Sequence, residues 1–193
     1  MMGQRAVFLD LNGTLVLPVK PCSLSELTLI EGADKAIARL SRAGFLCPIV
    51  TVQSRIAKGT FSMEEFHQWF HNFATRLRSG GAEIVGPYVC PHGFDEPCAC
   101  KKPSTVLYEL AAHEHAVDLQ RSFVIGDSAD DVRAAHRFGG QGCLVETGWA
   151  RDPREVERAG RSASFVAISL DDAVSWVLTR PEGPSGRQAE MPS

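Results

Sequence analysis

Four polar residues stand where apolar runs of the sequence end, and their types could perform phosphoryl chemistry. Asp10 follows the run VFL, Thr51 ends the run PIVT, and Asp127 follows the run FVIG. Lys102 stands just before a predicted helix that begins at Ser104. If these positions meet at one edge of a parallel sheet, two carboxylates with water form a Mg²⁺ site. A lysine and a hydroxyl beside that ion could hold the oxygens of a phosphoryl group.

Each of these residues also has a simpler interpretation. Asn12-Gly13 between apolar runs is typical of a tight β-hairpin, so residues 7–17 alone leave hairpin and active site equally open. Asp127 or Ser128 could cap the following helix, and Thr51 could be an ordinary strand residue. The order Asp, Thr, Lys, Asp at successive strand ends is what favours the active site.

Alternating strands and helices position these residues. The predicted strands are residues 5–10, 45–52, 83–89, 122–127, 143–146 and 164–168. The predicted helices are residues 33–43, 104–115, 129–138, 170–178 and one that begins at a capping box of Ser62 and Glu65. This alternation predicts an α/β, three-layer, Rossmann-like fold with a mostly parallel sheet. Residues 1–180 are expected to form one domain, and residues 181–193 a disordered tail rich in Pro, Gly and Ser.

The composition limits the possible partners. The chain has 193 residues and a net charge of −3, which argues against broad binding to nucleic acid or to anionic membranes. No apolar run is long enough to span a bilayer. Asp10 and Asn12 interrupt the apolar stretch near the N-terminus, so we expect no secretory signal and a reducing cytoplasm.

A loop rich in cysteine predicts a second metal site. Cys90, His92, Cys98 and Cys100 form the pattern C-x-H-x5-C-x-C, and three thiolates with one imidazole suit tetrahedral Zn²⁺. The alternative is a set of reduced thiols in a flexible loop. Four protein ligands would close the coordination shell, so the zinc would be structural. The other three cysteines are assigned to the core or to no role.

Taken together, these motifs resemble the haloacid-dehalogenase-like (HAD) phosphatase superfamily. DLNGT resembles its first motif, IVT its second, Lys102 its third, and GDSADD its fourth. The segments VTVQSRIAKG, CPHGFDEPCACKKP and TGWA are similar to the branch that contains D-glycero-D-manno-heptose-1,7-bisphosphate 7-phosphatase and the histidinol-phosphate phosphatases. The resemblance runs from about Val7 to Ala150.

The resemblance implies a role for each motif residue. Asp10 would be the nucleophile that forms an aspartyl-phosphate. Mg²⁺ would be held by Asp10, by the backbone carbonyl of Asn12 and by Asp127. Thr51 and Lys102 would bind the transferring phosphoryl group.

Further positions follow from the same likeness. Gln53, Arg55 and Lys101 would contact the substrate, and Asp131 would orient the metal shell rather than touch the ion. The family carries the four zinc ligands, and the metal would hold Lys102 in place. No large cap is expected, which favours a small phosphorylated metabolite such as a heptose bisphosphate. Where relatives have asparagine, glycine and arginine, this chain has Val52, Arg55 and Lys101, so its substrate can differ.

Asn12 departs from the family at a catalytic position. Phosphatases of this family carry there an aspartic acid that protonates the leaving oxygen and then activates water. An amide cannot transfer that proton, so the sequence leaves five alternatives. The enzyme could be slow, could act on a substrate whose leaving group needs little protonation, or could accumulate the aspartyl-phosphate. The protein could also bind a phosphometabolite without turnover, or carry an engineered Asp→Asn change. Histidinol-phosphate hydrolysis is a further alternative. A redox or zinc-finger interaction module is disfavoured because it leaves Asp10, Thr51, Lys102 and Asp127 unexplained. The sequence leaves the oligomeric state open, and a monomer is plausible.

Overall fold

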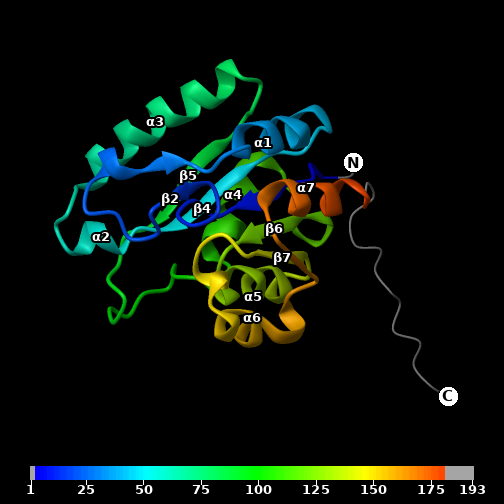
Figure 1. The fold of residues 1–193 in the computed structure, drawn as a ribbon. Helices are drawn as coiled ribbons and strands as arrows, with labels where there is room; N and C mark the ends of the chain where they lie inside the picture. The colour runs from blue at the N-terminus through cyan, green and yellow to red at the C-terminus, as the bar shows by residue number, and fades with distance from the viewer. Residues whose placement is uncertain (1–2, 181–193) are drawn as a thin grey trace.

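A six-stranded parallel sheet forms the centre of the chain in the computed structural model, which describes residues 3–180 (Figure 1). The strand order is β5-β4-β1-β6-β7-β8, and all neighbouring strands are parallel. The strands are β1 (Val7–Leu9), β4 (Pro48–Val52), β5 (Val85–Cys90), β6 (Phe123–Gly126), β7 (Gln141–Val145) and β8 (Phe165–Ala167). The central ones are continuous apolar runs because helices cover both faces of the sheet.

Helices pack on both faces and give the predicted three layers. On one face lie α1 (Ala33–Arg42), α3 (Met63–Ser79) and α7 (Leu170–Leu178), and on the other α4 (Val106–His115) and α5 (Ala129–Arg137). Side chains of β1 alternate between the two cores: Val7 and Leu9 join the first and Phe8 the second. The three-layer, Rossmann-like α/β fold expected from the sequence is therefore confirmed.

The helix α3 begins as its sequence predicts. The Ser62 hydroxyl accepts a hydrogen bond from the backbone N–H of Glu65, and the Glu65 carboxylate accepts one from the backbone N–H of Ser62. This reciprocal capping box satisfies two N–H groups that the first turn leaves without partners. It fixes the beginning of α3, which comes soon after β4 in the chain.

The segment after β1 combines a tight turn with a small flap. Gly13 N–H donates to the carbonyl of Val16, and Gly13 has a positive φ of 94° that favours glycine. The chain then forms β2 (Val16–Leu17), which pairs antiparallel with β3 (Thr28–Leu29). The hairpin signal at Asn12-Gly13 therefore describes a turn that leaves the strand of Asp10 and leads into this flap.

The order of the strands fixes where a ligand can bind. The chain runs from β1 outward through β4 to β5, and then returns to place β6 on the other side of β1. Such a reversal opens a crevice at the carboxyl ends of the strands. Asp10 follows β1, Thr51 lies near the end of β4, and Asp127 follows β6, so all three border this crevice.

Several short elements were not predicted. They include α2 (Ser54–Ala57), α6 (Pro153–Ala159) and four 3₁₀ turns: η1 (Leu24–Glu26), η2 (Leu119–Arg121), η3 (Trp149–Arg151) and η4 (Gly160–Ser162). Elements this short carry no helical periodicity, although Asp152 caps α6 and proline is its first residue. The tail expected at residues 181–193 lies outside the described residues. Between residues 3 and 180, no helix has the length and apolar character needed to cross a bilayer.

Candidate active site

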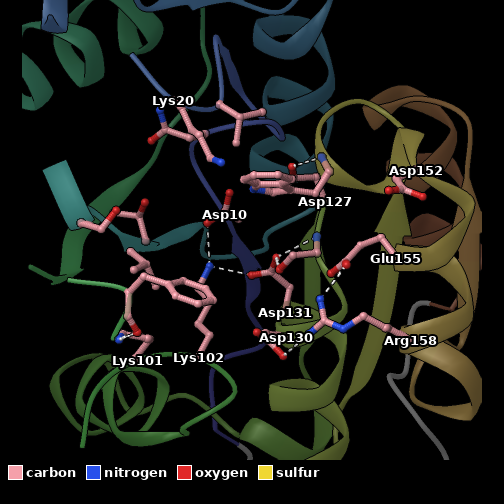
Figure 2. A pocket seen from close by; sticks show the side chains of 18 of the residues that line it. Asp10, Lys20, Lys101, Lys102, Asp127, Asp130, Asp131, Asp152, Glu155 and Arg158 are labelled. Carbon is pink, nitrogen blue, oxygen red and sulfur yellow. Dashed lines mark hydrogen bonds and ion pairs between the residues drawn. The ribbon is translucent and has the colours of Figure 1, made fainter. Parts of the chain in front are cut away.

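Lys102 lies between two carboxylates at the bottom of the site. Its Nζ donates to Oδ1 of Asp10 and to Oδ1 of Asp131, each at 2.6 Å, and all three residues are buried (Figure 2). Asp10 follows β1, Asp131 lies in the first turn of α5, and Lys102 comes from the loop between β5 and α4. Buried charges are tolerated when they are paired and hydrogen-bonded, so this pair of contacts ties three separate segments together.

Both oxygens of Asp131 accept hydrogen bonds. Its Oδ1 accepts from Lys102, and its Oδ2 accepts from the backbone N–H of Ser128 at 3.2 Å and from the Ser128 hydroxyl at 2.6 Å. Asp131 therefore positions Lys102 and the start of α5, which agrees with an orienting role.

Asp127 is enclosed by backbone. Its Oδ2 accepts from the N–H of Trp149 at 2.7 Å. A Cβ atom added to Gly13 would lie 2.0 Å from this oxygen, and one added to Gly148 would lie 1.8 Å from it. Only glycine allows both chain segments to approach so closely, which explains the glycine of DLNGT and that of TGWA.

The side chain of Asn12 is held in one orientation. Its Oδ1 accepts from Nε2 of Gln53 at 2.7 Å, and its Nδ2 donates weakly to the carbonyl of Pro18 in the flap at 3.4 Å. The same Gln53 amide donates to the Thr51 hydroxyl at 3.0 Å. Gln53 is buried and links Asn12 to Thr51, so in this structure it positions these two side chains.

Burial changes the titration of these groups. Burial, opposed by Lys102 and reinforced by Asp131, raises the pKa of Asp10 to about 6. Burial and the neighbouring Asp10 and Asp131 raise the pKa of Asp127 well above its ordinary value. Burial opposes the charge of Lys102, but Asp10 and Asp131 outweigh it, and the lysine pKa lies well above its ordinary value. Lys102 is therefore cationic at neutral pH.

Above these residues opens a cleft of about 820 Å³, within the range of small-molecule sites. Arg55 of α2 and Lys101 line it together with the catalytic candidates. Nζ of Lys101 donates to the carbonyls of Gly93, Phe94 and Glu96 at 2.5–3.1 Å. The three protons of this ammonium are thus used to fix the cysteine loop beside the cleft.

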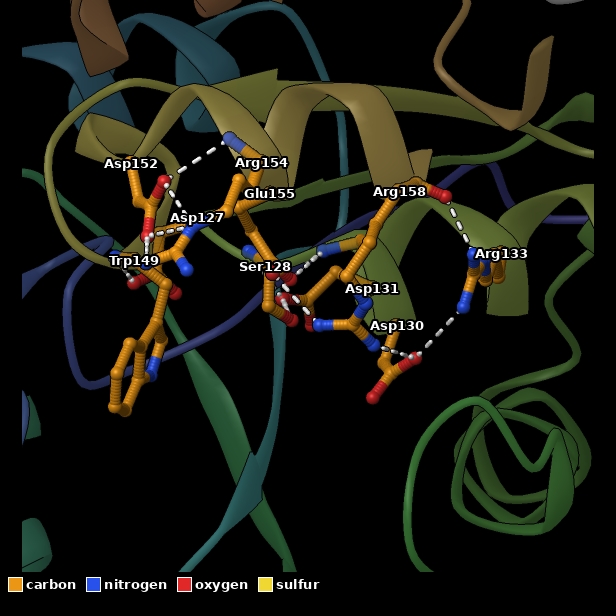
Figure 3. Close-up of polar contacts among 11 residues, drawn as sticks. Asp127, Ser128, Asp130, Asp131, Arg133, Trp149, Asp152, Arg154, Glu155 and Arg158 are labelled. Carbon is orange, nitrogen blue, oxygen red and sulfur yellow. Dashed lines mark hydrogen bonds and ion pairs between the residues drawn. The ribbon is translucent and has the colours of Figure 1, made fainter. Parts of the chain in front are cut away.

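The side of the cleft formed by α5 and α6 is a network of compensated charges (Figure 3). Glu155 accepts from the backbone N–H of Ala129 at 2.7 Å and from Arg158 at the same distance. Arg158 also lies 3.6 Å from Asp130. These contacts hold α6 against the start of α5 and so support the position of Asp127 and Asp131.

The four residues of the cysteine loop are close together. Sγ of Cys90 lies 3.6 Å from Nδ1 of His92 and 3.7 Å from Sγ of Cys98, and Sγ of Cys100 lies 3.3 Å from the same His92 nitrogen. Around a tetrahedral Zn²⁺, two sulfurs stand about 3.8 Å apart and a sulfur and a nitrogen about 3.6 Å apart. The donor set and its spacing therefore fit a zinc ion.

The carboxylates also fit a divalent cation. Oxygens of Asp10, Asp127 and Asp131 lie within 4.8 Å of one another. Lys102 uses one oxygen of Asp10 and Trp149 one oxygen of Asp127, so the described hydrogen bonds leave the second oxygen of each for a metal. Two carboxylates with water are the ligands that Mg²⁺ prefers.

The structure brings together the residues expected to catalyse: Asp10, Asn12, Thr51, Lys102 and Asp127 surround one point, and the four cysteine-loop residues surround another. Arg55, from α2, lines the same cleft. The sequence did not indicate the contact between Asp127 and the N–H of Trp149, because a backbone donor has no residue signature. The segment TGWA was the only available signal for it.

Comparison with known proteins agrees with this geometry. Residues 99–173 match the family model described as HAD-hydrolase-like. A D-glycero-D-manno-heptose-1,7-bisphosphate 7-phosphatase of Thermosynechococcus vestitus is 34% identical over 92% of this chain and 97% of its own. The histidine biosynthesis bifunctional protein HisB of Campylobacter jejuni is 31% identical over 85% of this chain and 48% of its own. A D,D-heptose 1,7-bisphosphate phosphatase from B. bronchiseptica, solved with magnesium and phosphate, has a TM-score of 0.82 at 28% identity, covering 92% of this chain and 99% of its own.

The parallel sheet, the motif residues at its edge and these similarities define a phosphatase of the HAD-like superfamily. Within it, the chain belongs to the branch that contains the heptose-1,7-bisphosphate 7-phosphatases and the HisB proteins. The resemblance drawn from the sequence is confirmed.

We expect the affinity for Mg²⁺ to depend on pH. A metal ligand must be ionised, and the pKa of Asp10 is raised to about 6, so protons compete with the metal below that pH. Because the pKa of the second carboxylate, Asp127, is also raised, the apparent Mg²⁺ dissociation constant should rise as the pH falls, by at least about tenfold for each unit of pH below 6. Titration with Mg²⁺ from pH 5 to 8 measures it, and a constant affinity over this range would contradict the assignment.

Replacing Gly13 by alanine should disrupt the site. The new Cβ would overlap Oδ2 of Asp127, and the positive φ adds strain. Gly44→Ala is the matched control, because Gly44 also has a positive φ, of 79°, but open space around it. The control should lose about 1–2 kcal/mol of stability and keep its Mg²⁺ affinity. Gly13→Ala should lose more stability and bind Mg²⁺ weakly. Equal effects in calorimetry and Mg²⁺ titration would show that the close approach to Asp127 is unimportant.

Proposed function

We propose that the protein is a Mg²⁺-dependent phosphomonoester hydrolase that acts on a small sugar phosphate through Asp10. The observation that carries this proposal is the placement of Asp10 against the Lys102 ammonium at the bottom of an open cleft, beside Asp127. Because relatives bear the name heptose-1,7-bisphosphate 7-phosphatase, a heptose bisphosphate is the leading substrate.

The reaction has two steps. A carboxylate oxygen of Asp10 attacks phosphorus, the bond from phosphorus to the sugar oxygen breaks, and an aspartyl-phosphate forms. The leaving sugar oxygen takes its proton from water, because Asn12 has none to give. Lys102 neutralises the nucleophile and, with the Thr51 hydroxyl, binds the phosphoryl oxygens. Water then attacks the phosphorus, releases phosphate and restores the Asp10 carboxylate.

Asp10, the backbone carbonyl of Asn12 and Asp127 would hold Mg²⁺. The ion would neutralise charge on the phosphoryl oxygens. Asp131 would keep Lys102 in place, and Gln53 would hold Thr51 and Asn12. Lys101 would hold the cysteine loop in position beside the substrate, because it donates three hydrogen bonds to carbonyls of that loop.

Asn12 has the hydrogen-bonding pattern of a protonated aspartic acid. Its oxygen accepts from Gln53, and its amide donates to the carbonyl of Pro18. An aspartic acid here would face the same carbonyl with its second oxygen, which favours the neutral, proton-carrying form of a general acid. Asn12 preserves the contacts and lacks the proton. We therefore propose that formation of the aspartyl-phosphate is slow unless the leaving group is already acidic, as in an anomeric or acyl phosphate. Attack of water on the aspartyl-phosphate is slow for every substrate, because the same Asp10 carboxylate leaves in that step.

We propose that Cys90, His92, Cys98 and Cys100 hold a structural zinc ion. Cys100 is followed directly by Lys101 and Lys102, so the ion would fix the backbone from which Lys102 reaches Asp10. All six cysteines are free thiols in the structure, which suits work in the reducing cytoplasm. A single chain contains every residue of the site, so a monomer suffices.

A second candidate function is binding without turnover, and Asn12 is the observation that favours it. A third is hydrolysis of histidinol phosphate, because HisB proteins are among the relatives.

Phosphate release distinguishes these candidates. The protein is incubated with Mg²⁺ and heptose 1,7-bisphosphate, heptose 7-phosphate, histidinol phosphate or acetyl phosphate. We expect Mg²⁺-dependent release that Asp10→Asn abolishes, with a heptose phosphate preferred to histidinol phosphate. Release that survives Asp10→Asn would reject the proposal, and Mg²⁺-dependent binding without release would support the binding protein.

Asn12→Asp should increase turnover of an alkyl phosphate ester. A general acid–base contributes about 10²–10⁴-fold in rate, or roughly 3–5 kcal/mol of barrier. We expect this gain in kcat/KM, which reports formation of the aspartyl-phosphate, for heptose 7-phosphate, and a smaller gain for acetyl phosphate, whose leaving group needs little protonation. An equal gain in kcat/KM on both substrates, or none, would show that position 12 does not protonate the leaving group.

Cys98→Ser should release the zinc and weaken the catalytic site. Elemental analysis should find zinc in the native protein and in Cys22→Ser, an exposed control cysteine outside the cluster. In Cys98→Ser we expect no zinc, a lower Tm and slower phosphate release, since Lys102 loses its support. A zinc-free variant with native Tm and native rate would refute this role of the metal.

A further inference from the structure

The basic side chains that line the cleft differ in their partners. On the side of α6, Arg154 pairs with Asp152 at 2.7 Å, and Arg158 pairs with Glu155 at 2.7 Å (Figure 3). These two guanidinium groups are compensated by carboxylates of their own helix region. They add little net attraction for an anion.

The flap and α2 carry basic groups of another kind. Lys20, Arg55 and Lys58 line the same cleft, and within residues 3–180 none has a carboxylate oxygen within 4.0 Å. In the view of Figure 2, Lys20 and Lys101 lie on opposite sides of Asp10. Basic groups without acidic partners on a concave surface concentrate anions there.

Two of these side chains are already directed by the fold. Nη2 of Arg55 donates to the carbonyl of Lys20 at 3.4 Å, which links α2 to the flap. Nζ of Lys20 lies 4.3 Å from the centre of the Trp149 ring, in a cation–π contact. Arg55 is half-buried and keeps most of its five N–H donors for a ligand.

The other basic groups of the cleft are engaged elsewhere. Lys102 is paired with Asp10 and Asp131, and Lys101 donates to three backbone carbonyls. For a second anionic group of the substrate, the side-chain N–H donors without a carboxylate partner within residues 3–180 are therefore those of the flap and α2.

We propose that Arg55, Lys20 and Lys58 bind a second phosphate of the substrate, the one that is not hydrolysed. This inference rests on the proposed function, which places the transferring phosphoryl group at Asp10. Three positive charges are more than one carboxylate would require, and they favour a phosphate group, which carries up to two negative charges. The planar guanidinium of Arg55 can bind two phosphate oxygens at once. The protein is thus selective for bisphosphates, and Arg55 is its main specificity-determining residue.

The test compares heptose 1,7-bisphosphate with heptose 7-phosphate. Arg55→Ala should lower the ratio of their kcat/KM values about tenfold, the loss of one charged hydrogen-bonding partner, and Lys20→Ala should lower it less. Arg154→Ala is the matched control, because Arg154 lines the same cleft but is paired with Asp152. In Arg154→Ala the ratio of the two kcat/KM values should equal that of the native protein. Melting curves establish that each variant is folded.

Direct binding separates this inference from the proposed function. Calorimetry on Asp10→Asn, with and without Arg55→Ala, measures the same two ligands without turnover. A tenfold loss of preference for the bisphosphate would support the subsite even if the native protein released no phosphate. Turnover in which Arg55→Ala and Arg154→Ala have equal ratios would overturn the subsite and leave the phosphatase intact. A native protein that prefers the monophosphate would also overturn it.

Discussion

Three carboxylates are buried together with one ammonium, and this imbalance of charge governs the site. Asp10 and Asp131 pair with Lys102, whereas Asp127 accepts from the backbone N–H of Trp149, so three negative charges are balanced by one positive charge when all three carboxylates are ionised. A buried cluster can reduce that excess by binding protons, and the raised pKa values of Asp10 and Asp127 express this tendency. A divalent cation would remove the excess without protonating the nucleophile. The proposed Mg²⁺ would thus balance the same charges that hold Lys102 in place.

The fold brings these charges together and limits their freedom. Neighbouring strands β4, β1 and β6 deliver their ends to one crevice, while the turn at Gly13 and the segment at Gly148 close around Asp127. Lys102 enters from the loop that carries Cys90, His92, Cys98 and Cys100, the residues that we propose hold zinc. The flap and α2 then form a wall whose basic groups have no carboxylate partner within residues 3–180. In the function that we propose, the bottom of the cleft transfers the phosphoryl group and this wall binds the rest of the substrate.

Much of this arrangement could be predicted from local sequence. Strand ends at Asp10, Thr51 and Asp127 follow from apolar runs, and the capping box of α3 from its residue spacing. The sequence could not reveal that Lys101 spends its protons on backbone carbonyls, because such contacts depend on how a loop folds back. It also could not show that Arg154 pairs with a carboxylate whereas Arg55 donates to a backbone carbonyl, since these contacts depend on neighbours in space. Short elements such as α6 lacked the periodicity that identifies longer helices.

We propose that Asp10 is a nucleophile whose phosphorylated form is long-lived, because Asn12 cannot activate water. Mass spectrometry of the protein, quenched in acid after mixing with acetyl phosphate and Mg²⁺, is the measurement that detects this form. We expect one added phosphoryl group on the peptide that contains Asp10, less of it in Asn12→Asp, and none in Asp10→Asn. Phosphate release without any such adduct, or an adduct on another residue, would contradict it.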